Sequence, residues 1–100
     1  MEIRVKVTKL PNPKGKTVAF ASATIAESFD KDGKPEGLAF AVNDLNVVDG
    51  KDGLFVGYPQ RSYKDKDGNL KYANIVVPVT AEGRAVMDDT ILAEAKKILG

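Results

Sequence analysis

The sequence contains no cysteine and no histidine. Without cysteine there can be no disulfide, no thiolate metal site and no cysteine nucleophile. Without histidine the chain also lacks the residue that most often acts as a general base or a metal ligand. The serines therefore have no histidine to activate them, and no glycine-rich phosphate loop is present. We expect a protein that is not an enzyme, with no catalytic residue, no metal or other cofactor, and no small-molecule substrate.

Long apolar runs are also missing from the sequence. No stretch is long and apolar enough to span a bilayer, and residues 1–20 contain no signal-peptide core. We expect a cytoplasmic protein that does not associate with a membrane.

The length and composition are those of an ordinary globular protein. The 100 residues are 43% hydrophobic and 29% charged, which fits one domain, residues 1–100, with one core. The net charge is only +1, but residues 53–80 hold four cations and two acids, whereas residues 27–52 hold seven acids and three lysines. This alternation either produces basic and acidic faces or belongs to solvated loops.

Alternation of apolar and polar residues predicts five strands. The strands are expected over residues 2–8, 17–29, 38–48, 54–58 and 71–79. In the second of these, Ala19, Ala21 and Ala23 share one face, where small side chains would allow a helix to approach closely. The segments 10–15, 30–37 and 60–70 are expected to be turns and loops, the last with a turn at Asp67-Gly68.

The chain is organised around residues 42–61. Two apolar runs flank Asp49-Gly50-Lys51-Asp52-Gly53, where aspartate and glycine tolerate a tight reversal. Pro59 cannot donate to a sheet ladder and so marks the end of the second strand. This pattern predicts a hairpin in the middle of the sheet.

The phase of the apolar residues slips within the third predicted strand. Leu38, Phe40 and Val42 occupy even positions, but Leu45 and Val47 occupy odd ones. A one-residue slip would turn the core face to solvent, so we expect a β-bulge or sharp bend at Asn43-Asp44.

The last part of the chain is predicted to be a buried strand followed by a helix. Ile75-Val76-Val77 is apolar on both faces, which favours burial. Thr80 can cap a helix, and an apolar stripe follows at Met87, Ile91, Ala95 and Ile98, with Leu92 and Leu99 beside it. The order predicts an α+β fold, an antiparallel β-meander of about five strands with a C-terminal α-helix.

The aspartate-rich turns do not match a calcium loop. Asp30-Lys31-Asp32-Gly33 and Asp65-Lys66-Asp67-Gly68 look alike, but neither run has the ligands that a calcium-binding loop needs at its later positions. We interpret both runs as hairpin turns.

The segment after Pro59 is the candidate binding site. Cations and tyrosines alternate in Arg61-Ser62-Tyr63-Lys64-Asp65-Lys66, and Lys71-Tyr72 closes the segment. Phosphate contacts and base stacking use these residue types. Composition alone favours a solvated, lysine-rich hairpin loop over a binding site.

The same central stretch resembles the SpoVG, or septation protein, family of bacteria. The resemblance lies in Asp44-Leu45-Asn46-Val47-Val48-Asp49-Gly50, followed by Gly53-Leu54-Phe55-Val56-Gly57-Tyr58-Pro59 and then a basic residue. Residues 17–25, 40–44 and 74–79 resemble further family segments, so the similarity covers about residues 1–97. The chain departs from the family pattern in longer loops at 30–37 and 62–72, and in Val77, where a histidine is usual.

The resemblance implies a β-sheet with a C-terminal helix, a homodimer, and DNA or RNA binding in the regulation of septation, sporulation or other gene expression. Under this hypothesis Arg61, Lys64, Lys66 and Lys71 contact phosphates and Tyr63 stacks on a base. Arg84 is a further candidate, because its family counterpart lies in a basic region. The alternative hypothesis is a protein–protein interaction module that does not bind nucleic acid.

Overall fold

The computed structural model describes residues 1–12 and 15–100. Part of the turn predicted at 10–15, residues 13–14, therefore lies outside the described residues. The elements are β1 (Glu2–Lys9), β2 (Thr17–Phe29), β3 (Pro35–Gly50), β4 (Gly53–Gly57), β5 (Gln60–Lys64), β6 (Leu70–Asn74) and α1 (Ala81–Leu99).

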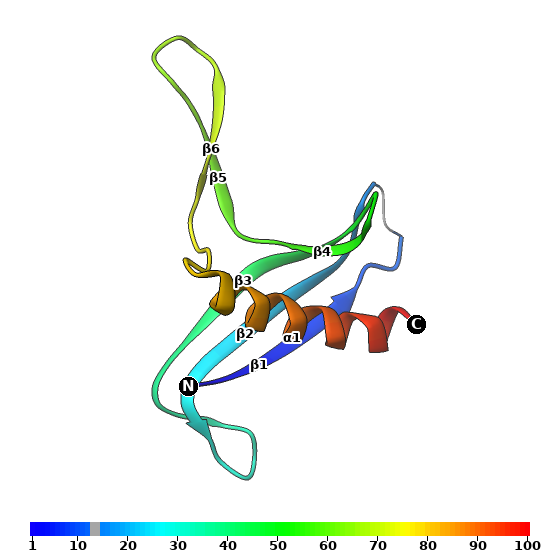
Figure 1. Cartoon of the computed structure of the whole chain (residues 1–100), viewed down its shortest axis with the longest axis vertical. Coiled ribbons are helices and arrows are strands. Elements are labelled where there is room, and N and C mark those ends of the chain that lie inside the picture. Colours follow the sequence, from blue (N-terminus) through cyan, green and yellow to red (C-terminus); the bar gives the residue numbers. More distant parts are fainter. Residues whose placement is uncertain (13–14) are drawn as a thin grey trace.

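Strands β1 to β4 form one antiparallel sheet in the order β1-β2-β3-β4, and α1 lies across one face of it (Figure 1). Strands β5 and β6 pair only with each other, as a separate two-stranded sheet. The α+β class and the C-terminal helix are confirmed. No helix within residues 1–12 and 15–100 combines the length and the apolar character needed to cross a bilayer.

The helix packs on the face of the sheet that carries the apolar side chains of β1 and small side chains of β2. Ala19, Ala21 and Ala23 of β2 are buried, and they belong to the same core cluster as Ile91 and Ala95 of α1. A face of alanines lets the helix approach the sheet without leaving a gap. The predicted apolar stripe of the helix is therefore confirmed at its centre, whereas Ile98, near the C-terminus, stays 38% exposed.

The N-terminus of α1 is capped as the sequence predicted. The Thr80 hydroxyl accepts a hydrogen bond from the Gly83 backbone N–H at 2.9 Å, and Glu82 lies in the first turn. These groups satisfy a free N–H and complement the positive end of the helix dipole.

A β-bulge is present at the predicted position in β3. Ala21 pairs with Leu45 and Ala23 pairs with Val42, so one residue of β2 lies opposite two residues of β3, Asn43 and Asp44. Asp44 has a φ of 62° in a non-glycine residue. The extra residue returns Leu45 to the buried face, which explains the phase slip in the sequence.

The central hairpin forms, but its place in the sheet was predicted wrongly. Gly50 pairs with Gly53 across a two-residue turn, as expected. However, β4 is an edge strand, and the inner strands are β2 and β3. Since Pro59 follows two residues after β4, the chain turns away at this edge and adds no further strand to the main sheet.

The segments predicted as a loop at 60–70 and a strand at 71–79 are organised differently. Residues 60–64 and 70–74 pair as a hairpin around the turn at Asp67-Gly68. The last strand ends at Asn74, and the apolar residues beyond it were wrongly predicted to be buried, because Ile75 is 61% and Val79 is 93% exposed. The pairing partner of β6 is β5, which lies outside the main sheet, so no core is available there.

Both aspartate-rich turns use the same local geometry, and their assignment as hairpin turns is confirmed. The Asp30 carboxylate accepts hydrogen bonds from the backbone N–H groups of Asp32 and Lys34, at 2.8 and 2.9 Å. The Asp65 carboxylate accepts equivalent bonds from Asp67 and Asn69, both at 2.9 Å. Each aspartate therefore closes its own turn.

The conformation of Asp44 yields a stability prediction. A left-handed conformation disfavours residues that carry a Cβ, aspartate and asparagine less than most, and it costs glycine nothing. We expect Asp44→Ala to lower the free energy of unfolding by about 1 kcal/mol, and Asp44→Gly to change it by less than about 0.5 kcal/mol. Urea denaturation of the two variants tests this, and equal stabilities would show that the bulge carries no conformational strain.

Candidate nucleic-acid interface

The hairpin of β5 and β6, residues 60–74, extends away from the main sheet (Figure 1). We refer to it as the arm. All five residues of β5 are exposed, as are all residues of β6 except the half-buried Ala73. Since exposed strands gain little from packing, the cross-strand hydrogen bonds and the Asp65 turn hold the arm together.

The register of the arm places three of the predicted residues on one face. Tyr63 pairs directly with Lys71, and Arg61 lies two residues before Tyr63 on the same side of β5. The Arg61 guanidinium lies 5.6 Å from the centre of the Tyr63 ring, within range of a cation–π contact. We call Arg61, Tyr63 and Lys71 the cationic face of the arm.

The two other predicted arm residues lie elsewhere on it. Lys64 pairs with Leu70 and shares the opposite face with Ser62 and Tyr72. Lys66 lies in the turn at the tip. The structure therefore brings Arg61, Tyr63 and Lys71 together and separates them from Lys64 and Lys66.

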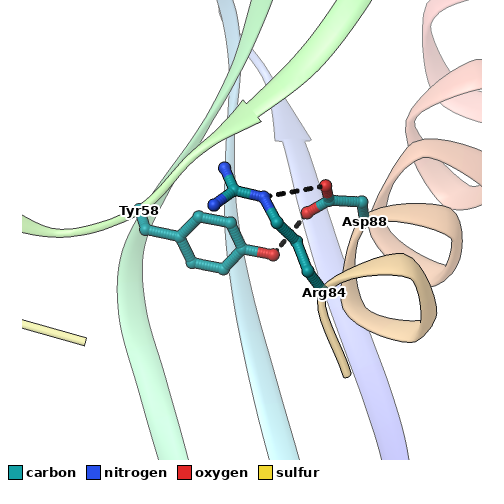
Figure 2. A network of polar contacts seen from close by, with 3 residues as sticks. All are labelled: Tyr58, Arg84 and Asp88. Carbon is teal, nitrogen blue, oxygen red and sulfur yellow. Dashed lines mark hydrogen bonds and ion pairs between the residues drawn. The ribbon is translucent and has the colours of Figure 1, made fainter. Parts of the chain in front are cut away.

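Arg84 lies near the start of α1, and it is engaged within the protein (Figure 2). Its Nε atom lies 3.6 Å from the Asp88 carboxylate, and its guanidinium lies 5.3 Å from the centre of the Tyr58 ring. The Tyr58 hydroxyl donates a hydrogen bond to the same carboxylate. Because Asp88 offsets its charge, Arg84 is a weaker candidate for a phosphate contact than the arm cations.

The Tyr58 hydroxyl is held in its protonated form. Burial raises the pKa of Tyr58 well above its ordinary value, and the hydrogen bond to Asp88 and the charge of Asp88 raise it further, while the Arg84 cation opposes them. Tyr58 immediately precedes Pro59, where the chain leaves the main sheet. The Tyr58–Asp88 bond therefore fastens the base of the arm to α1.

Two exposed aromatic residues, Phe20 and Tyr72, were not assigned a binding role from the sequence, although Tyr72 belongs to the candidate segment. Phe20 is 49% and Tyr72 is 64% exposed, and both line one hollow at the base of the arm, together with Asn46 and Gln60. The alternation in residues 17–29 predicts that Phe20 points away from the face that carries Ala19 and Ala21. This was the one sign in the sequence that Phe20 could be exposed. The orientation of Tyr72 depends on the register of the arm, for which the sequence offers no burial pattern.

Comparison with known proteins gives one family and several relatives. A family model described as SpoVG matches residues 37–97. A septation protein SpoVG from Thermoanaerobacter sp. (strain X514) is 36% identical over 97% of this chain and 89% of its own length. A relative of the same name from Clostridium acetobutylicum is 33% identical, over 94% and 82%. A third, from Symbiobacterium thermophilum, is 47% identical over 51% of this chain and 34% of its own length.

The Tyr58–Asp88 bond yields a prediction with a defined pH dependence. We expect Tyr58→Phe to lower the free energy of unfolding at pH 7 by about 1–2 kcal/mol, because a hydrogen bond to a carboxylate is removed. A raised pKa in the folded state stabilises the protein below the unfolded pKa of about 10 and loses this effect as the pH rises further. The stability difference between the parent and the variant should therefore shrink above about pH 10.

Urea denaturation at pH 7, 9, 10 and 11 measures this difference. Tyr63→Phe is the matched control, because it removes an exposed hydroxyl and keeps the ring, and it should change stability little at any of these pH values. A Tyr58→Phe difference that stays constant across the series would contradict the assigned bond.

Proposed function

Because this chain belongs to the SpoVG family, we propose that it is a homodimeric, nucleic-acid-binding regulator of septation, sporulation or other gene expression, and not an enzyme. The proposed role in septation is supported by the names of the relatives. Nucleic-acid binding and dimerisation are each supported by a separate feature of this chain's own surface.

The cationic face of the arm is the observation that carries nucleic-acid binding. Arg61 and Lys71 flank Tyr63 on an exposed two-stranded ribbon. A ribbon of this kind fits the major groove of duplex DNA, and arginine and lysine are the usual partners of phosphate oxygens. The arm carries four cations against Asp65 and Asp67. Both acids lie at the turn, where Asp65 already accepts two backbone hydrogen bonds.

Binding through phosphates has a measurable signature. Each neutralised phosphate releases about one counterion, so log K falls linearly with log salt, by about 0.9 per contact on duplex DNA. A dimer would engage up to twice as many phosphates as one chain. Phosphate contacts carry no direct sequence information, so binding through this face should vary little between DNA sequences.

We expect Arg61→Gln with Lys71→Gln to weaken binding to duplex DNA and to make the salt slope shallower by about one unit for each phosphate that the variant no longer neutralises. The measurement is fluorescence anisotropy with a labelled duplex at several salt concentrations. Two unrelated duplexes should lose affinity alike.

Lys31→Gln with Lys51→Gln is the matched control. It changes the net charge equally, and both lysines are exposed in turns away from the arm. Unchanged affinity and slope in the folded arm variant would remove the arm from the interface. Absence of any binding by the parent at low salt would favour the protein–protein interaction module without nucleic acid.

Dimerisation is supported by an apolar groove between the sheet and the start of α1. Its lining contains no charged residue. Phe40, Val76, Val79 and Val86 line it and are all exposed, with Val79 at 93%. Exposed apolar surface of this kind usually marks a contact with another protein.

The strand edge beside this groove favours a second copy of the chain as its occupant. Strand β4 covers β3 only from Asn46 to Gly50, so within the described residues the edge of β3 before Asn46 has no strand partner. In a two-fold dimer the same patch meets itself, and each copy brings both an unpaired edge and an apolar groove. Nucleic acid does not suit an uncharged groove.

We expect the parent protein to be a dimer at micromolar concentration and Val79→Glu to be a monomer. The substitution should not disturb the monomer fold, because Val79 is almost fully exposed, but it would bury two charges at a two-fold contact. Sedimentation velocity measures the outcome. Leu70→Glu, an equivalent change on the arm, is the control and should remain dimeric, whereas a monomeric parent would contradict the proposal.

A further inference from the structure

The face of the main sheet opposite α1 carries a mixed set of polar, cationic and aromatic side chains. On β1 this face holds Arg4, Lys6 and Thr8, whose direct partners on β2 are Thr24, Ser22 and Phe20. Asn46 of β3 lies beside Phe20. The core side chains and the helix occupy the other face (Figure 1). This open face is therefore available for a ligand.

Three adjoining hollows run along the open face. The first lies between Arg4, Lys6 and Thr24; the second contains Lys6, Ser22, Phe20 and Asp44. The third contains Phe20 and Asp44 together with Asn46, Gln60 and Tyr72. Shared residues join each hollow to the next, so the three form one track from β1 to the base of the arm. We call this track the open-face groove.

The composition of the groove matches one class of ligand. Phe20 and Tyr72 are exposed aromatic rings, and bases of single-stranded nucleic acids stack on such rings whatever their sequence. Arg4 and Lys6 supply cations at the β1 end, where the Arg4 guanidinium also lies 4.5 Å from the centre of the Phe29 ring. Amide side chains such as those of Asn46 and Gln60 can hydrogen-bond to base edges.

The acids on this face indicate how a strand would lie. Asp44 lines the middle of the groove, and Glu2 lies on the same side of β1 as Arg4. A carboxylate repels phosphate but accepts a hydrogen bond from the amino group of cytosine. The bases would therefore lie over Phe20, Asp44 and Asn46, with phosphates near Arg4 and Lys6. Duplex DNA cannot bind in this way, because its bases are stacked within the helix.

We propose that the open-face groove is a binding site for single-stranded nucleic acid, separate from the cationic face of the arm. The proposal rests on the proposed nucleic-acid-binding function and deepens it. Lys64 and Tyr72 lie on the groove side of the arm, whereas Arg61, Tyr63 and Lys71 lie on the other. The two faces of one hairpin thus serve single strands and duplexes respectively.

The first test compares a labelled single-stranded 12-mer of mixed sequence, as DNA and as RNA, with the duplex formed by the DNA strand. Phe20→Leu and Tyr72→Leu should each weaken single-strand binding about fivefold or more. Phe20→Leu should leave duplex binding unchanged. Phe55→Leu is the matched control, because Phe55 is 51% exposed and lines none of the three hollows, and it should change neither affinity.

The second test measures contact with the single strand directly, by fluorescence, and does not need a variant with weakened binding. The chain contains no tryptophan, so Phe20→Trp introduces a unique fluorophore. The single strand should quench its fluorescence by stacking, and Phe55→Trp should not be quenched. Quenching of both or of neither would overturn the groove as the site.

The outcomes also separate this inference from the proposed function. If the parent binds neither single strand nor duplex, both are overturned. If Arg61→Gln with Lys71→Gln abolishes binding but Phe20→Leu and Tyr72→Leu bind single strands as the parent does, the proposed function stands and the groove is overturned. If Phe20→Leu and Tyr72→Leu each weaken single-strand binding about fivefold or more and Phe20→Leu binds the duplex as the parent does, the groove is upheld.

Discussion

The packing of α1 on one face of the main sheet, over β1 and the alanines of β2, determines which surfaces remain available. Ile91 and Ala95 of α1 have no exposed area, and Ala19 of β2, in the same core cluster, is equally buried. Close packing on this face forms the hydrophobic core of the described residues. With one helix in the described residues, the other face of the sheet receives no cover. The open-face groove, the cationic face of the arm and the apolar groove beside Phe40 are therefore all surfaces that the helix leaves uncovered.

The parts of the fold that could be predicted are those where burial alternates along the chain. The bulge at Asn43-Asp44 was predicted because the buried residues on both sides of it record the phase change. Strand β5 was predicted as a loop, and β6 was predicted with wrong limits. Neither face of the arm is buried, so no alternation of apolar and polar residues marks its strands. The apolar run from Ile75 to Val79 was misjudged for a related reason, since a core strand and an exposed contact surface have the same composition.

The candidate site was predictable in its residue types and not in its geometry. Charge and aromatic content identified Arg61, Tyr63, Lys64 and Lys71, but their division between two faces depends on the register set by the Asp65 turn. Arg84 shows the opposite limit. Its charge and its spacing of four residues from Asp88 were evident from the sequence, whereas its contact with the Tyr58 ring depends on how α1 packs against the sheet.

Because the two strands of the arm are joined at its base, the arm can change in length without altering the core. The Ile75 backbone N–H donates a hydrogen bond to the Pro59 carbonyl at 2.9 Å, so the chain leaves and re-enters the body at nearly the same point. Two additional residues in each strand would lengthen the arm by about 7 Å and preserve the side on which every later residue lies. One additional residue in each strand would exchange the two sides beyond the insertion. In relatives of this chain, the arm can therefore be longer or shorter by two residues per strand without any change in the main sheet and helix.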